Sequence, residues 1–164
     1  ANKDTSFEAD GTMNLDARVL FYYNAGGVTP AMATTHVGEG SDYALAFLDG
    51  DDKPFDGSKA YKLHLPPDVP VNNFWAVTMY DTQTRTQLQT SQLFPTVGSL
   101  TKGMKKNADG SYDVYFAPEA PKGMEGNWLQ SVPGKSWFVI LRMYGPLEPW
   151  INKTWRPGNI ELAN

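Results

Sequence analysis

Residues 137–144 have the sequence Trp-Phe-Val-Ile-Leu-Arg-Met-Tyr, and they form the most apolar run in the chain. A short run rich in β-branched and aromatic side chains is typical of a strand. Because successive positions are apolar except for Arg142, we expect a central strand that is covered on both faces. A guanidinium in such a strand must be paired or reach water. We therefore expect Arg142 to be buried beside a carboxylate, with Asp81 and Asp113 as candidates. The alternative is that Arg142 opens onto a pocket and holds an anionic ligand.

Other short strands are predicted upstream of this run. They are Tyr43–Leu48, Lys59–Leu65, Phe74–Tyr80, Gln87–Leu93 and Tyr112–Phe116. In residues 59–65 apolar and polar side chains alternate, which indicates one buried face and places His64 on the polar face. The segment 74–80 is apolar on both faces and predicts a second central strand, whereas 87–93 is polar and predicts an edge strand. Residues 107–110, Asn-Ala-Asp-Gly, predict a hairpin turn.

The N-terminal part of the chain has a different pattern. Residues 1–12 are polar and predict a loop, and Asn14 can cap a helix that ends at Gly26-Gly27. A second, short helical piece is predicted near residues 31–35. One helix followed by seven or eight strands predicts a mainly β fold, an antiparallel β-sandwich with Greek-key or jelly-roll connections and one N-terminal helix. We assign residues 1–40 to an arm, helix and linker, and residues 41–164 to the sandwich.

Composition excludes several classes of protein. The 164 residues suffice for one domain, and 41% of them are hydrophobic. The net charge of -4 gives no electrostatic attraction to nucleic acid or anionic membranes, and no apolar run could span a bilayer. There is no cysteine, which excludes disulfides and thiolate chemistry. The chain begins with Ala1 rather than Met, so we expect a trimmed or excerpted product.

The familiar motifs of cofactor and metal chemistry are missing from the sequence. No nucleophile elbow, P-loop or dinucleotide fingerprint occurs. Aspartate-glycine clusters at 49–52 and 107–113 contain oxygen ligands, but neither completes a calcium-binding pattern. We therefore interpret both clusters as turns and expect no metal and no cofactor.

Five residues are candidates for a ligand-binding site: His64, Arg85, Trp128, Arg142 and Tyr144. His64 could act as a general base if a carboxylate lay across the sheet, although a surface role is the simpler interpretation. Arg85 lies in a turn and is a candidate for a fixed contact, with a structural ion pair as the alternative. The five Trp could line a carbohydrate cleft or fill the core. Trp150 and Trp155 are expected to be the exposed ones because their segment is rich in Pro and Gly.

Several blocks of the sequence resemble a known family. They are Asp16–Arg18, Phe21–Tyr23, Thr29–Met32, Tyr61–Pro67, Phe74-Trp75, Tyr80–Arg85, Lys106–Ser111, Ala120–Gly123, Asn127-Trp128, Arg142–Pro146 and Trp155. In these blocks the chain resembles the C-terminal DUF1214 domain of bacterial exported proteins that also carry an N-terminal DUF1254 domain. Both domains are named for unknown function. The resemblance extends from about residue 13 to the end. It implies a jelly-roll-like sandwich, a periplasmic or secreted location, and an upstream DUF1254-like domain as partner.

These observations predict a ligand-binding or structural module of an exported bacterial protein. The ligand would be a small molecule or a carbohydrate. The alternative is a hydrolase-like or carbohydrate-active enzyme whose site needs the upstream domain. A third possibility is an element that forms homo-oligomers. An exposed aromatic cleft with Arg142 or Arg85 at its base would favour ligand binding, and a close pair of His64 with a carboxylate in a pocket would favour the enzyme.

Overall fold

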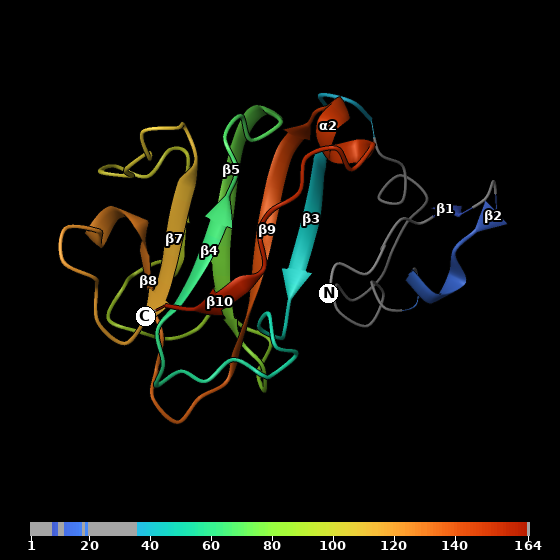
Figure 1. Cartoon of the computed structure of the whole chain (residues 1–164). Helices are drawn as coiled ribbons and strands as arrows, with labels where there is room; N and C mark the ends of the chain where they lie inside the picture. The colour runs from blue at the N-terminus through green and yellow to red at the C-terminus, as the bar shows by residue number, and fades with distance from the viewer. Residues whose placement is uncertain (1–7, 10–11, 18, 20–35, 164) are drawn as a thin grey trace.

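The computed structural model describes residues 8–9, 12–17, 19 and 36–163. In this part of the chain two four-stranded sheets form a β-sandwich, which confirms the predicted fold class (Figure 1). The first sheet has the order β3 (Ser41–Ala46), β9 (Trp137–Pro146), β5 (Val71–Asp81) and β6 (Thr96–Gly98). The second has the order β10 (Ile160–Leu162), β4 (Tyr61–Leu65), β7 (Tyr112–Ala117) and β8 (Trp128–Gln130).

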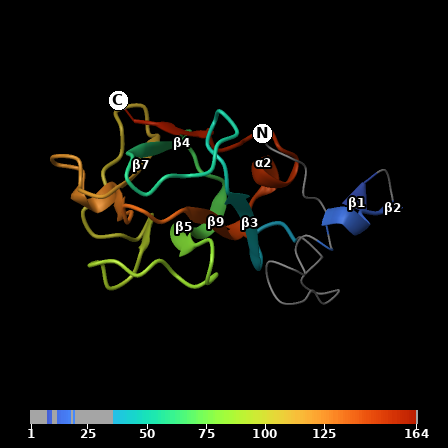
Figure 2. The ribbon, with the colours of Figure 1, turned by 90° about the horizontal axis from the view of Figure 1, so that it is seen from below.

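The two sheets lie in separate layers, and the chain passes between the layers repeatedly, as in jelly rolls (Figure 2). All pairs in the two sheets are antiparallel except β7 with β8, which is parallel. A separate short ladder joins β1 (Glu8–Ala9) to β2 (Thr12–Met13). The sandwich is therefore mixed at one edge rather than antiparallel throughout.

The core lies between the layers and has an aromatic centre. Trp137 has no exposed surface, and its ring stacks on Phe55 at 4.0 Å and on Phe116 at 4.9 Å between centroids. Tyr61 meets the same indole edge-on at 5.6 Å. The alternation predicted for residues 59–65 is confirmed, because Tyr61, Leu63 and Leu65 are buried and the residues between them are half-buried. Inward-facing side chains of both sheets thus supply the core, as expected for a sandwich.

The two central strands differ from their prediction on one point. In β5 only every second residue is buried, from Trp75 to Asp81, and the residues between them are half-buried. In β9 the outward-facing Ile140, Arg142 and Tyr144 are likewise half-buried. The expected cover on both faces is therefore wrong, because the outer face of the first sheet is apolar and yet only partly covered.

Two other sequence-based expectations need correction. Residues 87–93 form no strand, and only Gln87 makes a bridge, to Tyr80. The 107–110 segment is a turn, closed by the Gly110 N–H donating to the Asn107 carbonyl, but it joins no hairpin because β7 pairs with β4 and β8. The sequence patterns did not predict several short elements, which are β6, β8, β10, η2 (Glu125–Asn127) and α2 (Glu148–Ile151).

The predicted N-terminal helix is described only at its start. Residues 15–17 and 19 are helical, and the Asn14 side chain accepts a hydrogen bond from the Ala17 N–H at 3.1 Å. Asn14 is therefore the cap, as expected. The rest of that helix and the piece predicted at 31–35 lie outside the described residues. In the described ranges no helix has the length and apolar character that crossing a membrane requires.

Candidate functional site

Three of the five candidate ligand-binding residues, Arg85, Arg142 and Tyr144, lie on the outer face of the first sheet. Because side chains alternate between the two sides of a strand, every second residue of β9 points to this face. The residues on it are Tyr144, Arg142, Ile140 and Phe138 from β9, Tyr43 and Leu45 from β3, and Phe74, Ala76, Thr78 and Tyr80 from β5. The face is rich in aromatic rings and carries the guanidinium of Arg142 among them.

The Arg142 side chain is held mainly by aromatic rings. Its Cζ atom lies 4.2 Å from the Tyr144 ring centroid and 5.3 Å from that of Tyr43. One Nη donates a hydrogen bond to Ser41 Oγ at 3.2 Å, whereas the buried Nε has no hydrogen-bond partner in the described part of the chain. Stacking a guanidinium on tyrosine contributes about 0.5–2 kcal/mol. The rings therefore fix the position of the cation but do not neutralise its charge.

The expected burial of Arg142 beside a carboxylate is wrong. Among the described residues no carboxylate forms an ion pair with it. Asp81 pairs with Lys135, and Asp113 pairs with His64. The reason is geometric. Asp81 lies five residues beyond the position of β5 that faces Arg142 and so points to the opposite side, and Asp113 belongs to the second sheet.

A hollow of about 260 Å³ lies beside Arg142 on the outer face. Its walls are Tyr43, Arg142 and Tyr144 at one end and Tyr80 and Gln87 at the other, over a floor of Ala76, Thr78, Thr96 and Ile140. Burial raises the pKa of the Tyr80 phenol, while the nearby positive charge of Arg142 acts in the opposite direction. The phenol is thus neutral at pH 7 and can donate a hydrogen bond into the hollow.

Arg85 lies at the other end of the same face. Its Cζ atom is 5.9 Å from the Phe138 ring centroid and 6.0 Å from that of Phe47. Phe138 is itself stacked between Phe47 and Tyr80, with centroids at 4.8 and 5.1 Å. The structure therefore brings Arg85, Arg142 and Tyr144 to one surface.

His64 lies on the outer face of the second sheet and does not join this group. Its Nδ1 is 2.8 Å from Asp113 Oδ1, across the β4–β7 pair. The other carboxylate oxygen of Asp113 accepts a hydrogen bond from Asn107 at 3.3 Å. The His64 side chain is 44% exposed. Within the described part of the chain no hydroxyl group bonds to its ring, because Ser111, in the adjoining turn, donates to Asp109.

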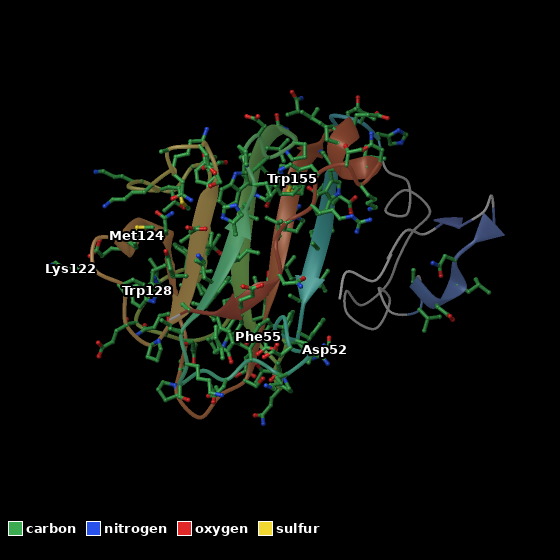
Figure 3. All side chains as sticks on the ribbon, in the orientation of Figure 1. Asp52, Phe55, Lys122, Met124, Trp128 and Trp155 are labelled. Carbon is green, nitrogen blue, oxygen red and sulfur yellow. The ribbon has the colours of Figure 1, made fainter. Side chains whose placement is uncertain are left out.

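Trp128 is half-buried on β8, and its Nε1 donates to the Ala117 carbonyl. The expectation that Trp150 and Trp155 are exposed is wrong. Both are buried, because their segment folds back over the sandwich and their Nε1 atoms donate to Asp42 and to the Pro67 carbonyl. Figure 3 places Trp155 near the end of the sandwich at which α2 lies. Among the described residues these tryptophans therefore line no cleft.

Asp81 is a buried carboxylate with a structural role. Its Oδ1 accepts hydrogen bonds from the N–H groups of Gln83 and Thr84 at 2.7 and 3.2 Å, and its Oδ2 accepts one from Lys135. The Lys135 hydrogen bond, together with the Gln83 N–H, lowers the pKa of Asp81 below 3.8, its ordinary value. A small hollow of about 70 Å³ lies beside this pair. The two charged groups that line it, Asp81 and Lys135, already bond each other. Asp81 therefore closes the turn after β5.

Replacing Asp81 with Asn is expected to lower the free energy of unfolding at pH 7 by about 2–3 kcal/mol, because hydrogen bonds to a charged group are lost. A lowered pKa in the folded state stabilises the protein above the ordinary pKa, and this stabilisation disappears as the pH falls through the folded value. The wild-type protein should therefore lose stability below about pH 5 more steeply than the variant. Urea unfolding at several pH values measures both effects. Asp51→Asn, at a 71% exposed side chain, is the control; an equal loss in both variants would contradict the role of Asp81.

Together, the fold and the outer face define a β-sandwich module with a tyrosine-lined, cationic hollow on one sheet. Residues 40–148 match the family described as "Protein of unknown function (DUF1214)". Since the match covers more than half of the chain, the chain belongs to the DUF1214 family. No curated protein matches it.

Two solved structures are similar to the chain. A crystal structure of a protein from Vibrio parahaemolyticus has a TM-score of 0.68 and 24% sequence identity, over 94% of this chain and 36% of that one. An uncharacterised protein from Burkholderia cenocepacia has a TM-score of 0.49 and 16% identity, over 79% of this chain and 32% of its own. At this identity the Vibrio likeness supports the fold alone. The chain spans about one third of the length of both proteins.

Proposed function

We propose that this domain binds a small, planar organic anion in the hollow on the outer face of the first sheet. The observation that carries the proposal is the state of Arg142, a half-buried guanidinium at the wall of the hollow that no described carboxylate neutralises. Carboxylates and phosphates are the groups that a guanidinium binds most strongly, through charge-assisted hydrogen bonds.

The remaining lining supports a planar ligand. Three tyrosines surround the hollow, and aromatic rings stack on flat partners. The floor offers the Thr78 and Thr96 hydroxyls, which bond each other at 2.9 Å. Such a mixture of apolar walls with a few polar groups is typical of small-molecule sites, although this hollow is small for one. A compact ring with one acidic substituent fits these dimensions and this chemistry.

The alternative function, a hydrolase-like or carbohydrate-active enzyme, has less support. The pair of His64 and Asp113 has the distance that a general base requires. However, the pair lies on the other sheet from the hollow, and its described surroundings supply no nucleophile. Two further parts of our proposal rest on the family resemblance alone: a periplasmic or secreted location, and an upstream DUF1254-like domain in the whole protein.

Binding of a model anion tests the proposed function. We expect benzoate to bind the wild-type domain in isothermal titration calorimetry, and Arg142→Gln to weaken this binding at least tenfold, or about 1.4 kcal/mol. The free energy of unfolding should fall by less than about 2 kcal/mol, the most that stacking of the guanidinium on a tyrosine ring contributes.

The matched control is Arg156→Gln, because Arg156 is exposed and lies outside the lining of the hollow. This variant should bind like the wild type. Benzyl alcohol, which lacks the acid, should bind at least tenfold more weakly than the carboxylate. Equal affinities of Arg142→Gln and wild type for the carboxylate would overturn the proposal.

A further inference from the structure

Strand register arranges most of the residues that line the hollow in three rows across the sheet. They are Tyr43, Arg142 and Ala76 in the first row, Ile140, Thr78 and Thr96 in the second, and Tyr80 and Gln87 in the third. Successive rows on one face of a sheet are two residues, or about 7 Å, apart along the strand. Arg142 and Tyr80 therefore lie at opposite ends of the hollow, with the second row as the floor between them.

The lining at the end away from Arg142 consists of neutral polar side chains. Gln87 carries an amide, and Tyr80 keeps its proton at neutral pH because burial raises the pKa of its phenol, although the charge of Arg142 opposes this rise. No described residue forms a hydrogen bond with the Tyr80 hydroxyl or with the Gln87 side-chain amide. Each of these groups offers both a donor and an acceptor, so together they suit a hydroxyl group of a ligand.

The Tyr80 ring is held in place by its aromatic neighbour. It stacks on Phe138 with 5.1 Å between the ring centroids and an angle of 19° between the ring planes. Phe138 stacks in turn on Phe47, at 4.8 Å. A side chain that is already fixed in the free protein loses little conformational freedom when a ligand binds. The phenol is therefore preorganised as the second contact of the hollow, opposite the guanidinium that Tyr144 and Tyr43 hold.

We propose that the ligand of this hollow is an aromatic acid with a hydroxyl group para to the acid, bound with the acid at Arg142 and the hydroxyl at Tyr80 and Gln87. This inference rests on the proposed function and deepens it, because it assigns the second end of the same site. A para substituent lies on the line from the acid through the ring, so it points from the first row toward the third. A methyl group in its place would leave the phenol and the amide unpaired, which costs affinity.

Calorimetric titration with two acids of the same shape tests this inference. The wild-type domain is expected to bind para-hydroxybenzoate about fivefold tighter than para-methylbenzoate, the ratio that one or two neutral hydrogen bonds give. Tyr80→Phe keeps the ring that stacks on Phe138 and removes the phenol oxygen, so the ratio should fall below about two. The matched control is Tyr115→Phe, because Tyr115 is half-buried on β7 of the other sheet, outside the lining of the hollow. This variant should keep the wild-type ratio.

The outcomes separate this inference from the proposed function. If benzoate binds through Arg142 but para-hydroxybenzoate binds no tighter than para-methylbenzoate, the hydroxyl assignment is wrong and the anion site stands. If Tyr80→Phe keeps the wild-type ratio, the hydroxyl is bound elsewhere, which also overturns the inference. If none of the three acids binds the wild type, the proposed function fails and this inference fails with it. Thermal unfolding verifies that both variants are folded.

Discussion

Replacing Trp137 with Ala is expected to lower the free energy of unfolding by about 3–5 kcal/mol, one of the two largest effects that we expect of a single substitution in this domain. The side chain is fully buried and stacks on Phe55 and Phe116, while Tyr61 meets its edge. Its removal leaves a large cavity at the point where the two sheets meet. Because domains are stable by only about 5–15 kcal/mol, the melting temperature should fall by about 10 °C or more.

The indole nitrogen gives this prediction a sharp control. Trp137 Nε1 is buried and has no hydrogen-bond partner among the residues that the structure describes. Trp137→Phe therefore breaks no hydrogen bond and keeps an aromatic ring, so we expect a loss of only about 1–2 kcal/mol. Urea unfolding, with equal slopes for all three proteins, measures the difference. If Phe were as damaging as Ala, the ring stacking would not be what stabilises the core.

The periodicity of the sequence could predict the strands but not how well each face is covered. Tyr61, Leu63 and Leu65 alternate with polar residues, and the buried face follows directly from that pattern. In β5 and β9 both faces are apolar, which is equally typical of a strand buried on both sides and of a sheet with a half-buried aromatic face. The sequence of β9 contains no signal that separates these cases except Arg142.

The candidate site could be predicted only where one residue marks it. Arg142 was identifiable as the charge in an apolar strand, but Tyr43, Thr78 and Tyr80 became its neighbours through strand pairings that a single sequence does not specify. Trp150 was misplaced for a related reason. A segment rich in Pro and Gly is typical of an exposed tail, whereas here Trp150 Nε1 donates to Asp42 from the distant β3.

Replacing Gly98 with Ala is expected to disturb the sheet and the candidate site together. A Cβ atom at Gly98 would overlap the carbonyl oxygen of Trp75 and lie 2.9 Å from the Ala76 Cα atom. Both obstacles are backbone atoms of β5, so β6 must move away from its neighbour. We expect a loss of at least about 3 kcal/mol in the free energy of unfolding, the upper part of the range for overpacking.

The displacement of β6 should also reach the hollow. Thr96, two residues before Gly98, lies in the floor and bonds Thr78. Gly98→Ala is therefore expected to weaken binding of benzoate as well as folding, in calorimetry at a temperature where the variant is still folded. Gly50→Ala is the matched control, because the atom nearest to its new Cβ would belong to the flexible Glu161 side chain, at 3.3 Å, and the others lie at ordinary contact distance. We expect it to change stability by less than about 1 kcal/mol and binding not at all. A Gly98→Ala variant as stable as the Gly50→Ala variant would mean that β6 does not pack against β5 as closely as described.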